Sequence, residues 1–327
     1  MSQSNTTENY QNSRSPGATS KRLRTVVVLL AAYNGVDWIY EQIYSILSQN
    51  HVVTSIVIND DGSTDGTLDL LQRSFGKNGR VKLLPRSTPT RSAAQNFLFL
   101  IKNAPICEFD YVALSDQDDL WFPNKLIDAI NKLEQSEADA YSSATIARWP
   151  DGSTRLISLS RPQTRSDYLF EGAGQGCTFV LTRNFFFKVR EFLLKNNYYT
   201  KNLHFHDWTI YAIARSWNLK WIFDPKPSLL YRQHASNDTG ARMSLQGVLK
   251  RLKLIRNGWY SNQLLLINSI CHVAAPDNSY VTDFLKLLES PRTLRRTFTL
   301  FFFCVANGRR RYMDNFVLLL ACIFGWI

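Results

Sequence analysis

The feature that most narrows the fold is a repeated unit in which an apolar, β-favouring run passes through a polar turn into a helical pattern. The first run covers residues 25–30 and is followed by the turn Ala31-Ala32-Tyr33-Asn34-Gly35. Apolar residues then recur at helical spacing from Ile39 to Leu47. The second run covers residues 52–58 and ends in a turn over residues 59–67. Such units call for a parallel sheet that binds ligands beyond the carboxyl ends of its strands. The sequence therefore predicts an α/β fold with a mostly parallel central sheet flanked by helices.

Acidic residues crowd the end of a third apolar run. Residues 111–114 read Tyr-Val-Ala-Leu, and Asp116-Gln117-Asp118-Asp119 follow after one serine. Three carboxylates within four residues repel one another, and a divalent cation is a common way to relieve that repulsion. A solvated, Asp-rich turn would show the same residues. The spacing alone leaves both interpretations open, a cation site at the strand end and a simple turn.

Six motifs, in this order, resemble those of family 2 glycosyltransferases, which have the GT-A fold. They lie at residues 31–35, 59–67, 116–126, 176–178, 206–208 and 231–237, so the resemblance spans about residues 25–240. Within the family, the chain looks most like the bacterial rhamnosyltransferase-type enzymes of surface polysaccharide assembly. A lone Asp-x-Asp pair is a weak signal, whereas the ordered set is a specific one. The resemblance implies a GT-A fold with a Rossmann-like sheet.

The resemblance also implies a donor site for a nucleotide-diphosphate sugar, either UDP- or dTDP-linked. The residues implied to bind the nucleotide are Ala31, Tyr33, Asp61 and Asp116. Asp61 would accept a hydrogen bond from the base, and Tyr33 would pack beside the ring. Asp118 and His234 would hold Mg²⁺ or Mn²⁺, which prefer oxygen ligands and would neutralise the charge of the departing diphosphate. For His234, a solvated loop histidine is the alternative.

The loop after the third predicted strand departs from the family pattern. The family usually carries Asn and Gly there, where this chain has Pro89 and Thr90 ahead of the helix start Ala94-Gln95-Asn96-Phe97. The donor contacts of this loop therefore do not carry over from the resemblance.

Asp207 is implied to be the catalytic base. It stands at the start of a predicted helix, because apolar residues recur from Ile210 to Ala214. On spacing alone, an Asp in this place is more often an N-cap. A base here would take the proton of the acceptor hydroxyl while that oxygen attacks the anomeric carbon opposite the nucleotide, which inverts the configuration. His206 is interpreted as a structural residue outside the catalytic set.

A glycine-bearing segment, residues 172–178, is implied to flank the acceptor or the diphosphate. It lacks the Lys-Ser/Thr ending of a P-loop. The residues assigned to this vicinity are Gly176, Cys177, Thr178, Trp208 and Arg232. Cys177 is expected to be a small buried thiol, because the sequence shows no histidine placed to activate it. Arg232 is a candidate fixed charge for phosphate.

The sequence predicts three regions. Residues 1–22 are rich in Ser, Thr, Asn and Gln and lack an apolar core, which indicates a disordered polar leader and not a signal peptide. Residues 23–240 form the expected GT-A catalytic domain. Residues 241–327 form a basic, amphipathic, helical C-terminal region. Five cysteines without C-x-x-C spacing favour a reducing cytoplasm and disfavour a disulfide framework.

The C-terminal region concentrates the net charge of +11 and is expected to attach to a membrane. One helical face collects Leu245, Val248, Leu249, Leu252, Ile255 and Trp259. The apolar segments 298–305 and 316–327 flank Arg309-Arg310-Arg311, and each is shorter than the roughly 20 residues that a spanning helix needs. We expect peripheral attachment to the inner, cytoplasmic face of the cell membrane, with the arginines at the headgroups. Packing against the catalytic domain is the alternative. Nucleic-acid binding is not expected, because no known binding module is present.

These observations predict an inverting, metal-dependent glycosyltransferase that moves a sugar, rhamnose or another hexose, to a lipid-linked or polysaccharide glycan acceptor in O-antigen or capsule biosynthesis. Two alternatives stay open. A sugar nucleotidyltransferase would use the same cation but attack phosphorus. A non-catalytic, membrane-bound scaffold for polysaccharide assembly would keep the fold without the chemistry.

Overall fold

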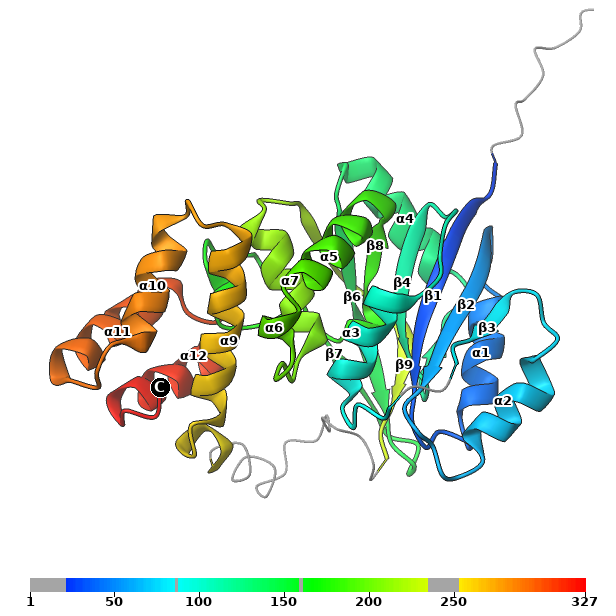
Figure 1. Cartoon of the computed structure of the whole chain (residues 1–327), viewed down its shortest axis with the longest axis horizontal. Helices are drawn as coiled ribbons and strands as arrows, with labels where there is room; N and C mark the ends of the chain where they lie inside the picture. The colour runs from blue at the N-terminus through cyan, green and yellow to red at the C-terminus, as the bar shows by residue number, and fades with distance from the viewer. Residues whose placement is uncertain (1–21, 86–87, 159–160, 235–252) are drawn as a thin grey trace, which may run out of the picture.

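A nine-stranded sheet forms the centre of the computed structural model, which describes residues 22–85, 88–158, 161–234 and 253–327 (Figure 1). The strand order is β3-β2-β1-β4-β8-β6-β9-β5, and β7 pairs with β6. The strands are β1 (Arg24–Ala32), β2 (Val52–Asp60), β3 (Val81–Leu83), β4 (Tyr111–Asp116), β5 (Leu120–Trp121), β6 (Ala140–Arg148), β7 (Thr154–Ile157), β8 (Val180–Thr182) and β9 (Trp221–Arg232). The first four strands of this order run parallel, and β8 enters antiparallel between β4 and β6. The predicted α/β sheet is confirmed.

Strand β1 shows why helices cover both faces of the sheet. Successive residues of a strand point to opposite faces. Val26 and Val28 pack into one buried cluster, and Val27 and Leu29 pack into another. The first cluster is closed by α1 (Ile39–Leu47), α2 (Thr67–Phe75) and α4 (Lys125–Ser136), and the second by α3 (Ala93–Asn103), α5 (Arg183–Lys195) and α7 (His206–Ser216). Burial on both faces explains the continuous apolar run of β1.

The described part of the C-terminal region is helical and packs against α7 (Figure 1). Its helices are α9 (Trp259–Ala274), α10 (Ser279–Glu289), α11 (Leu294–Asn307) and α12 (Tyr312–Ile323). Leu264 and Ile267 of α9 share a core cluster with Tyr211 of α7. Among the described helices, none combines the length and the hydropathy that crossing a bilayer requires. The predicted leader, up to residue 21, and most of the predicted basic helix lie outside the described residues.

The loop between α11 and α12 overturns one expectation about the tail. The side chain of Arg310 is only 1% exposed, and its guanidinium forms ion pairs with Asp167 and Glu171, which precede β8 in the chain. Arg309 pairs with Glu171 as well, and Arg311 donates to the backbone carbonyl of Ser158. The expectation that these arginines lie at lipid headgroups is therefore wrong for Arg310, because this side chain is sealed inside the protein.

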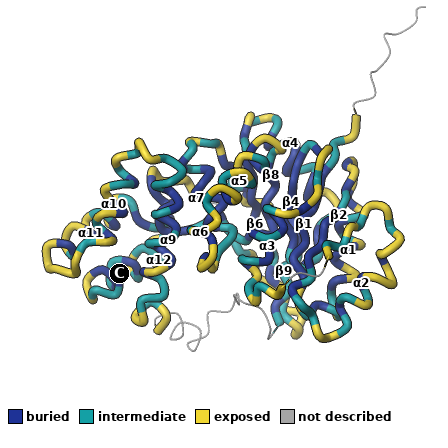
Figure 2. The backbone as a smooth tube through the Cα atoms, viewed as in Figure 1, coloured by how far each residue is buried: buried dark blue, intermediate teal, exposed yellow. Residues whose placement is uncertain are grey.

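Helix α11 nevertheless leaves one apolar face uncovered. Leu300 and Cys304 are buried, whereas Leu294, Phe298, Phe302 and Val305 are 80%, 62%, 66% and 52% exposed. These four residues recur every three or four positions and so form one side of the helix, called here the outer stripe. Figure 2 shows α11 as an exposed end of the molecule, away from the sheet.

Candidate active site

The carboxyl ends of three strands meet at one edge of the sheet and bring the polar turns together. Ala31 of β1 lies opposite Asn59 of β2 on one side and opposite Asp116 of β4 on the other. Ala31 is buried. Asp61, which follows β2, donates its backbone N–H to the carbonyl of Ala32 at 2.8 Å. The three turns singled out in the sequence therefore share one edge, where open α/β sheets bind ligands.

Gln117 holds the turn after β1 in place. Its side-chain oxygen accepts from the backbone N–H of Tyr33 at 2.7 Å, and its side-chain nitrogen donates to the carbonyl of Tyr33 at 2.6 Å. The amide thus extends the pairing of β1 with β4 by one more residue. Tyr33 itself is 55% exposed. Sequence reasoning gave Gln117 no role, because a clamp onto a backbone leaves no trace in spacing.

A buried pair of asparagines joins the strand ends to α3. Asn59 donates from its side chain to the side-chain oxygen of Asn96 at 2.9 Å, and Asn96 donates to the carbonyls of Ala32 and Asn59, each at 3.3 Å. Both side chains are almost fully buried. A buried amide is costly unless it is hydrogen-bonded, so this pair fixes the spacing of β1, β2 and α3.

Asp61 is engaged by the loop that departs from the family pattern. Its carboxylate accepts from the backbone N–H groups of Thr90 and Arg91 at 2.6 and 2.7 Å, and from the Thr90 hydroxyl at 3.0 Å. The Asp61 side chain is buried, at 3% exposure of the residue. Arg91 has a positive φ of 58°, which turns its N–H toward the carboxylate. Asp61 therefore organises the loop beside the predicted nucleotide site.

Asp118 and His234 lie together although they are far apart in the sequence. His234 Nε2 is 2.7 Å from Asp118 Oδ2. The imidazole stacks on Trp38, with ring centroids 4.1 Å apart and an angle of 11° between the planes. His234 follows the end of β9, so the contact joins the segment after β4 to the last strand of the sheet. The structure places these two predicted ligands side by side.

A second cluster lies beside them and includes a residue that the sequence analysis left without a role. Ligand atoms of Asp116, Asp119 and Cys177 lie within 4.8 Å of one another. Asp119 is fully buried, and neither of its carboxylate oxygens has a hydrogen-bond partner among the described residues. Burial, reinforced by the charges of Asp118 and Asp116, raises the pKa of the Asp119 carboxyl well above its usual range. Orphaned buried oxygens among other acids fit a hard divalent cation, whereas the thiol of Cys177 does not.

Lys125 places a positive charge under this cluster. Its side chain is buried, its Nζ donates to the carbonyl of Cys177 at 2.9 Å, and it lies 4.3 Å from the centroid of the Trp121 ring. Burial lowers the pKa of Lys125 to about 8. Burial, together with the nearby Asp119 and Asp116, raises the pKa of the Cys177 thiol well above its usual value. Cys177 is therefore a protonated, buried thiol, as expected from the sequence.

The first turn of α7 presents Asp207 beside a neutral histidine. Burial raises the pKa of the half-buried Asp207 to about 6, and its Oδ1 accepts from the backbone N–H of Trp208 at 2.7 Å. His206 stacks on Phe97 with centroids 4.0 Å apart, and burial lowers the pKa of this imidazole to about 3. His206 is thus uncharged at neutral pH, which agrees with its interpretation as a structural residue.

Gly176 and Cys177 connect α7 to the acidic cluster. A Cβ on Gly176 would lie 2.2 Å from Nε2 of His206, so the backbone of η2 (Gly176–Thr178) presses directly on that ring. The next residue, Cys177, belongs to the cluster with Asp116 and Asp119. Two adjacent residues therefore touch the acids on one side and the neighbour of Asp207 on the other.

The sequence matches the family model described as "Glycosyl transferase family 2" over residues 27–215, which is more than half of the chain. The chain belongs to glycosyl transferase family 2. One relative is the dTDP-rhamnosyl transferase RfbG of Shigella flexneri. It is 38% identical over 255 residues, which cover 78% of this chain and 87% of RfbG.

Two further relatives extend the comparison. The UDP-Glc:alpha-D-GlcNAc-diphosphoundecaprenol beta-1,3-glucosyltransferase WfaP of Escherichia coli is 31% identical over 112 residues, 34% of this glycosyltransferase and 42% of WfaP. The solved structure of the mannosyltransferase PcManGT from Pyrobaculum calidifontis, in complex with GDP-Man and Mn²⁺, is 16% identical. It covers 93% of this chain and 87% of that chain with a TM-score of 0.50, a likeness that shows the fold alone.

The residues assigned to the acceptor side of the glycosyltransferase take structural contacts. Thr178 is buried, and its hydroxyl donates to the carbonyl of Gln175 at 2.8 Å. Trp208 is buried, and its indole N–H donates to the carbonyl of Tyr168 at 2.8 Å. Arg232 forms an ion pair with Glu41 of α1. These contacts hold the three side chains in place within the fold.

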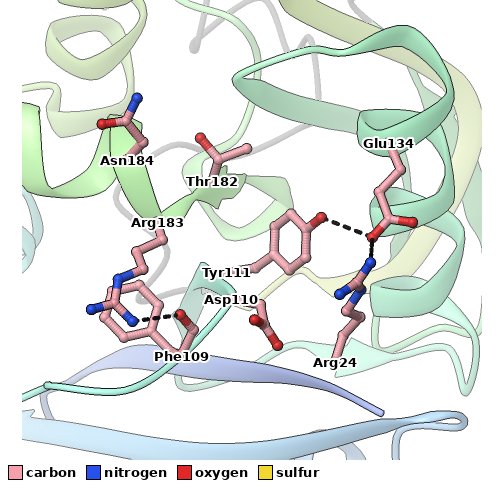
Figure 3. Close-up of a pocket in the computed structure, with 8 residues that line it drawn as sticks. All are labelled: Arg24, Phe109, Asp110, Tyr111, Glu134, Thr182, Arg183 and Asn184. Carbon is pink, nitrogen blue, oxygen red and sulfur yellow. Dashed lines mark hydrogen bonds and ion pairs between the residues drawn. The ribbon is translucent and has the colours of Figure 1, made fainter. Parts of the chain in front are cut away.

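A shallow pocket of about 510 Å³ lies at the other end of the sheet (Figure 3). It is lined by Arg24, Phe109, Asp110, Tyr111, Glu134, Thr182, Arg183 and Asn184. Arg24 and Tyr111 are the first residues of β1 and β4, so the pocket is at the amino ends of the strands. Arg24 and Tyr111 both contact Glu134, at 2.7 and 3.2 Å. The candidate active site of the glycosyltransferase is therefore at the opposite, carboxyl end.

Proposed function

We propose that this enzyme is an inverting, metal-dependent glycosyltransferase that moves rhamnose or another hexose from a UDP- or dTDP-linked donor to a lipid-linked glycan acceptor. The observation that carries the proposal is the contact of Asp118 with His234, 2.7 Å apart and next to Asp116 and the buried Asp119. The name of RfbG, a dTDP-rhamnosyl transferase, supports the choice of rhamnose and dTDP.

Asp118 and His234 are the residues proposed to hold Mg²⁺ or Mn²⁺, with Asp116 and the orphaned carboxylate of Asp119 behind them. Carboxylate oxygens and an imidazole nitrogen suit these cations. When bound, the cation supplies positive charge against the diphosphate as it departs. Trp38 fixes the plane of the His234 ring by stacking, so the imidazole stays directed at Asp118.

The nucleotide is proposed to lie along the edge formed by the ends of β1, β2 and β4. Tyr33 is exposed there, and the clamp from Gln117 fixes its backbone. Ala31 and Asp116 are neighbours on this edge. Asp61 is proposed to contact the base while its carboxylate also holds the loop at Thr90.

Asp207 is proposed to act as the base. With a pKa of about 6, its carboxylate is ionised at neutral pH and close enough to the working pH to accept a proton well. The acceptor hydroxyl gives its proton to Asp207, its oxygen forms a bond to the anomeric carbon, and the bond from that carbon to the diphosphate oxygen breaks. One displacement inverts the anomeric configuration. His206 is unsuitable as the base, because its ring is stacked on Phe97 and its Nε2 is buried without a hydrogen-bond partner among the described residues.

The outer stripe of α11 is proposed to attach the enzyme peripherally to the cytoplasmic face of the cell membrane. The stripe exposes two phenylalanines, and Arg292 and Arg295 are exposed near its amino end. Aromatic side chains beside basic residues suit an anionic bilayer surface. The name of WfaP specifies an acceptor on diphosphoundecaprenol, which supports a lipid-linked acceptor for this chain.

Product analysis tests the proposal. The purified enzyme, Mn²⁺ and a panel of nucleotide sugars are incubated with and without a lipid-linked glycan acceptor. Release of nucleoside diphosphate that depends on acceptor and metal is the expected result. In a separate incubation with a nucleoside triphosphate and a sugar 1-phosphate, release of pyrophosphate would instead identify a nucleotidyltransferase. No turnover of any donor by the wild type, under conditions where nucleotide binding is measured by calorimetry, would indicate a non-catalytic scaffold.

A further inference from the structure

Arg310 joins the C-terminal region to residues 167–172, a segment that packs against α7. Its Nη1 is 2.6 Å from Asp167 Oδ2, and its Nη2 donates to the carbonyl of Gly172 at 2.6 Å. Its backbone N–H donates to Glu171 Oε1 at 2.6 Å. The guanidinium also lies 4.8 Å from the centroid of the Phe223 ring. The guanidinium and the backbone N–H of Arg310 thus contact three residues, Asp167, Glu171 and Gly172, of one segment, residues 167–172, whose first turn is η1 (Asp167–Leu169).

That same segment contacts α7 along much of the length of the helix. Asp167 accepts from the Tyr211 hydroxyl at 2.8 Å and from Arg215 at 2.9 Å. Gly172 packs so closely on α7 that an added Cβ would lie 3.1 Å from the Cα of Trp208 and 3.2 Å from its backbone nitrogen. This nitrogen is the one that donates to Asp207. Arg310, Gly172, Trp208 and Asp207 therefore form an unbroken series of contacts.

We propose that Arg310 is a positioning residue for catalysis: by holding residues 167–172 against α7 it fixes the place of the Asp207 carboxylate and of the wall beside it. The proposal rests on the proposed role of Asp207 as the base. It makes the C-terminal region part of the catalytic unit, because the residue that orients the wall lies between α11 and α12.

Arg296 supplies a matched control. It is also a buried arginine of the C-terminal region, and its guanidinium donates to the carbonyls of Leu287, Leu288 and Ile327 at 2.9 to 3.0 Å. All three acceptors belong to the C-terminal region itself. Replacement of Arg296 therefore loosens that region without touching residues 167–172.

The experiment compares Arg310→Lys, Arg296→Lys and Gly172→Ala in the full-length enzyme, well below each melting temperature. Lysine keeps the charge but cannot serve Asp167, Glu171 and Gly172 at once. Arg310→Lys is expected to lower kcat at least tenfold with the donor KM within twofold. The acid limb of the kcat profile of this variant should move to lower pH, because water that reaches Asp207 lowers the pKa of its carboxyl. Arg296→Lys is expected to keep kcat within twofold while lowering the melting temperature.

Gly172→Ala keeps the proposal testable if Arg310→Lys does not fold. It removes no charge and only pushes the wall away from Trp208, so the same fall in kcat at constant donor KM is expected. An unchanged kcat in folded Arg310→Lys, or in Gly172→Ala when the first variant does not fold, overturns the proposal. An equal fall in Arg296→Lys overturns it as well. Asp207→Asn is measured in parallel: if that variant stays active, the assigned base is wrong, whereas an inactive Asp207→Asn beside a fully active Arg310→Lys removes only the positioning role.

Discussion

At the scale of single residues, Asp207 combines reactivity with a cost in stability. Burial raises the pKa of its carboxyl to about 6, above its ordinary value of 3.8. The folded protein therefore binds more protons than the unfolded chain between about pH 4 and 6, so the contribution of this group to stability falls as pH rises through that window. Above this pH window, the ionised carboxylate lowers the free energy of unfolding by up to about 3 kcal/mol. The same burial makes the carboxylate a better base.

Replacement of Asp207 by Asn is expected to abolish transfer and to stabilise the fold. Asparagine cannot accept the proton, and it carries no buried charge. The melting temperature of Asp207→Asn should exceed that of the wild type at pH 8. The corresponding gain in the free energy of unfolding is up to about 3 kcal/mol and shrinks toward pH 4. For the wild type, the acid limb of the kcat profile should have an apparent pKa of about 6. Calorimetric scans of both proteins at pH 8 and pH 4 check the stability prediction. Equal melting temperatures of Asp207→Asn and the wild type at pH 8 would contradict it.

Replacement of Asp118 by Ala is expected to abolish the effect of metal on nucleotide binding. The wild type should bind UDP or dTDP at least tenfold more tightly with Mn²⁺ than without it, because a cation held by Asp118 would offset the negative charge of the diphosphate. Isothermal calorimetry with and without Mn²⁺ measures both affinities. Asp128→Ala is the control, since Asp128 pairs with Lys226 on the exposed side of α4. A metal effect that persists in Asp118→Ala refutes the assigned ligand.

The sequence predicted part of this residue-level picture. Asp116 and Asp118 were assigned roles from a motif, and the structure places them at the expected sheet edge. Asp119 stands in the same motif but received no role, because its complete burial without a partner depends on η2 and α4 folding over it. Burial of that kind is set by contacts between distant segments and cannot be read from spacing.

At the scale of elements, the junction of η2 with α7 depends on a residue that has no side chain. A Cβ on Gly176 would meet Nε2 of His206 at 2.2 Å, so Gly176→Ala must displace the imidazole or the first turn of α7. We expect a loss of about 2 kcal/mol of stability, as for overpacking in a core, and a marked fall in kcat. Gly79→Ala is the control, because a Cβ there has nothing within 4 Å. Equal melting temperatures and turnover for both variants would contradict the packing argument.

The strand–turn–helix units were predictable because strands of six to nine residues and helices of nine or more carry a clear period. The antiparallel entry of β8 and the pairing of β5 with β9 were not. These strands have three and two residues, and such short segments show no alternation. Their place in the sheet is set by their pairing with β4, β6 and β9.

At the scale of the whole molecule, the outer stripe should decide whether the enzyme binds membranes. Phe298→Ser with Phe302→Ser is expected to reduce sedimentation with vesicles of anionic lipid at least tenfold, because exposed aromatic surface is lost without disturbing buried residues. Tyr198→Ser is the control, since Tyr198 is 81% exposed on α6 (Asn197–Thr200) of the catalytic domain. Undiminished vesicle binding by the double variant would exclude the stripe as the attachment surface.

The helical nature of the C-terminal region was predictable from its pattern, whereas the fate of its arginines was not. Apolar residues at helical spacing indicated helices, and the described part of the region is helical. Arg310 looked like a membrane residue because it stands between two apolar segments. Its partners, Asp167 and Glu171, lie 143 and 139 positions earlier in the sequence. A pattern of neighbouring residues carries no information about such distant ion pairs.

The pairing of β5 with β9 determines when, during synthesis, the two proposed cation ligands Asp118 and His234 come together. Leu120 and Trp121 lie opposite Leu230 and Leu229, so the segment that carries Asp118 docks against the final strand of the sheet. His234 follows that strand. A nascent chain that ends before β9 already contains the whole β1–β2–β4 edge but has no imidazole to meet Asp118. Under the proposed function, a chain that is terminated or cut before β9 therefore lacks one of the two proposed cation ligands. Such a fragment is not expected to consume nucleotide sugars.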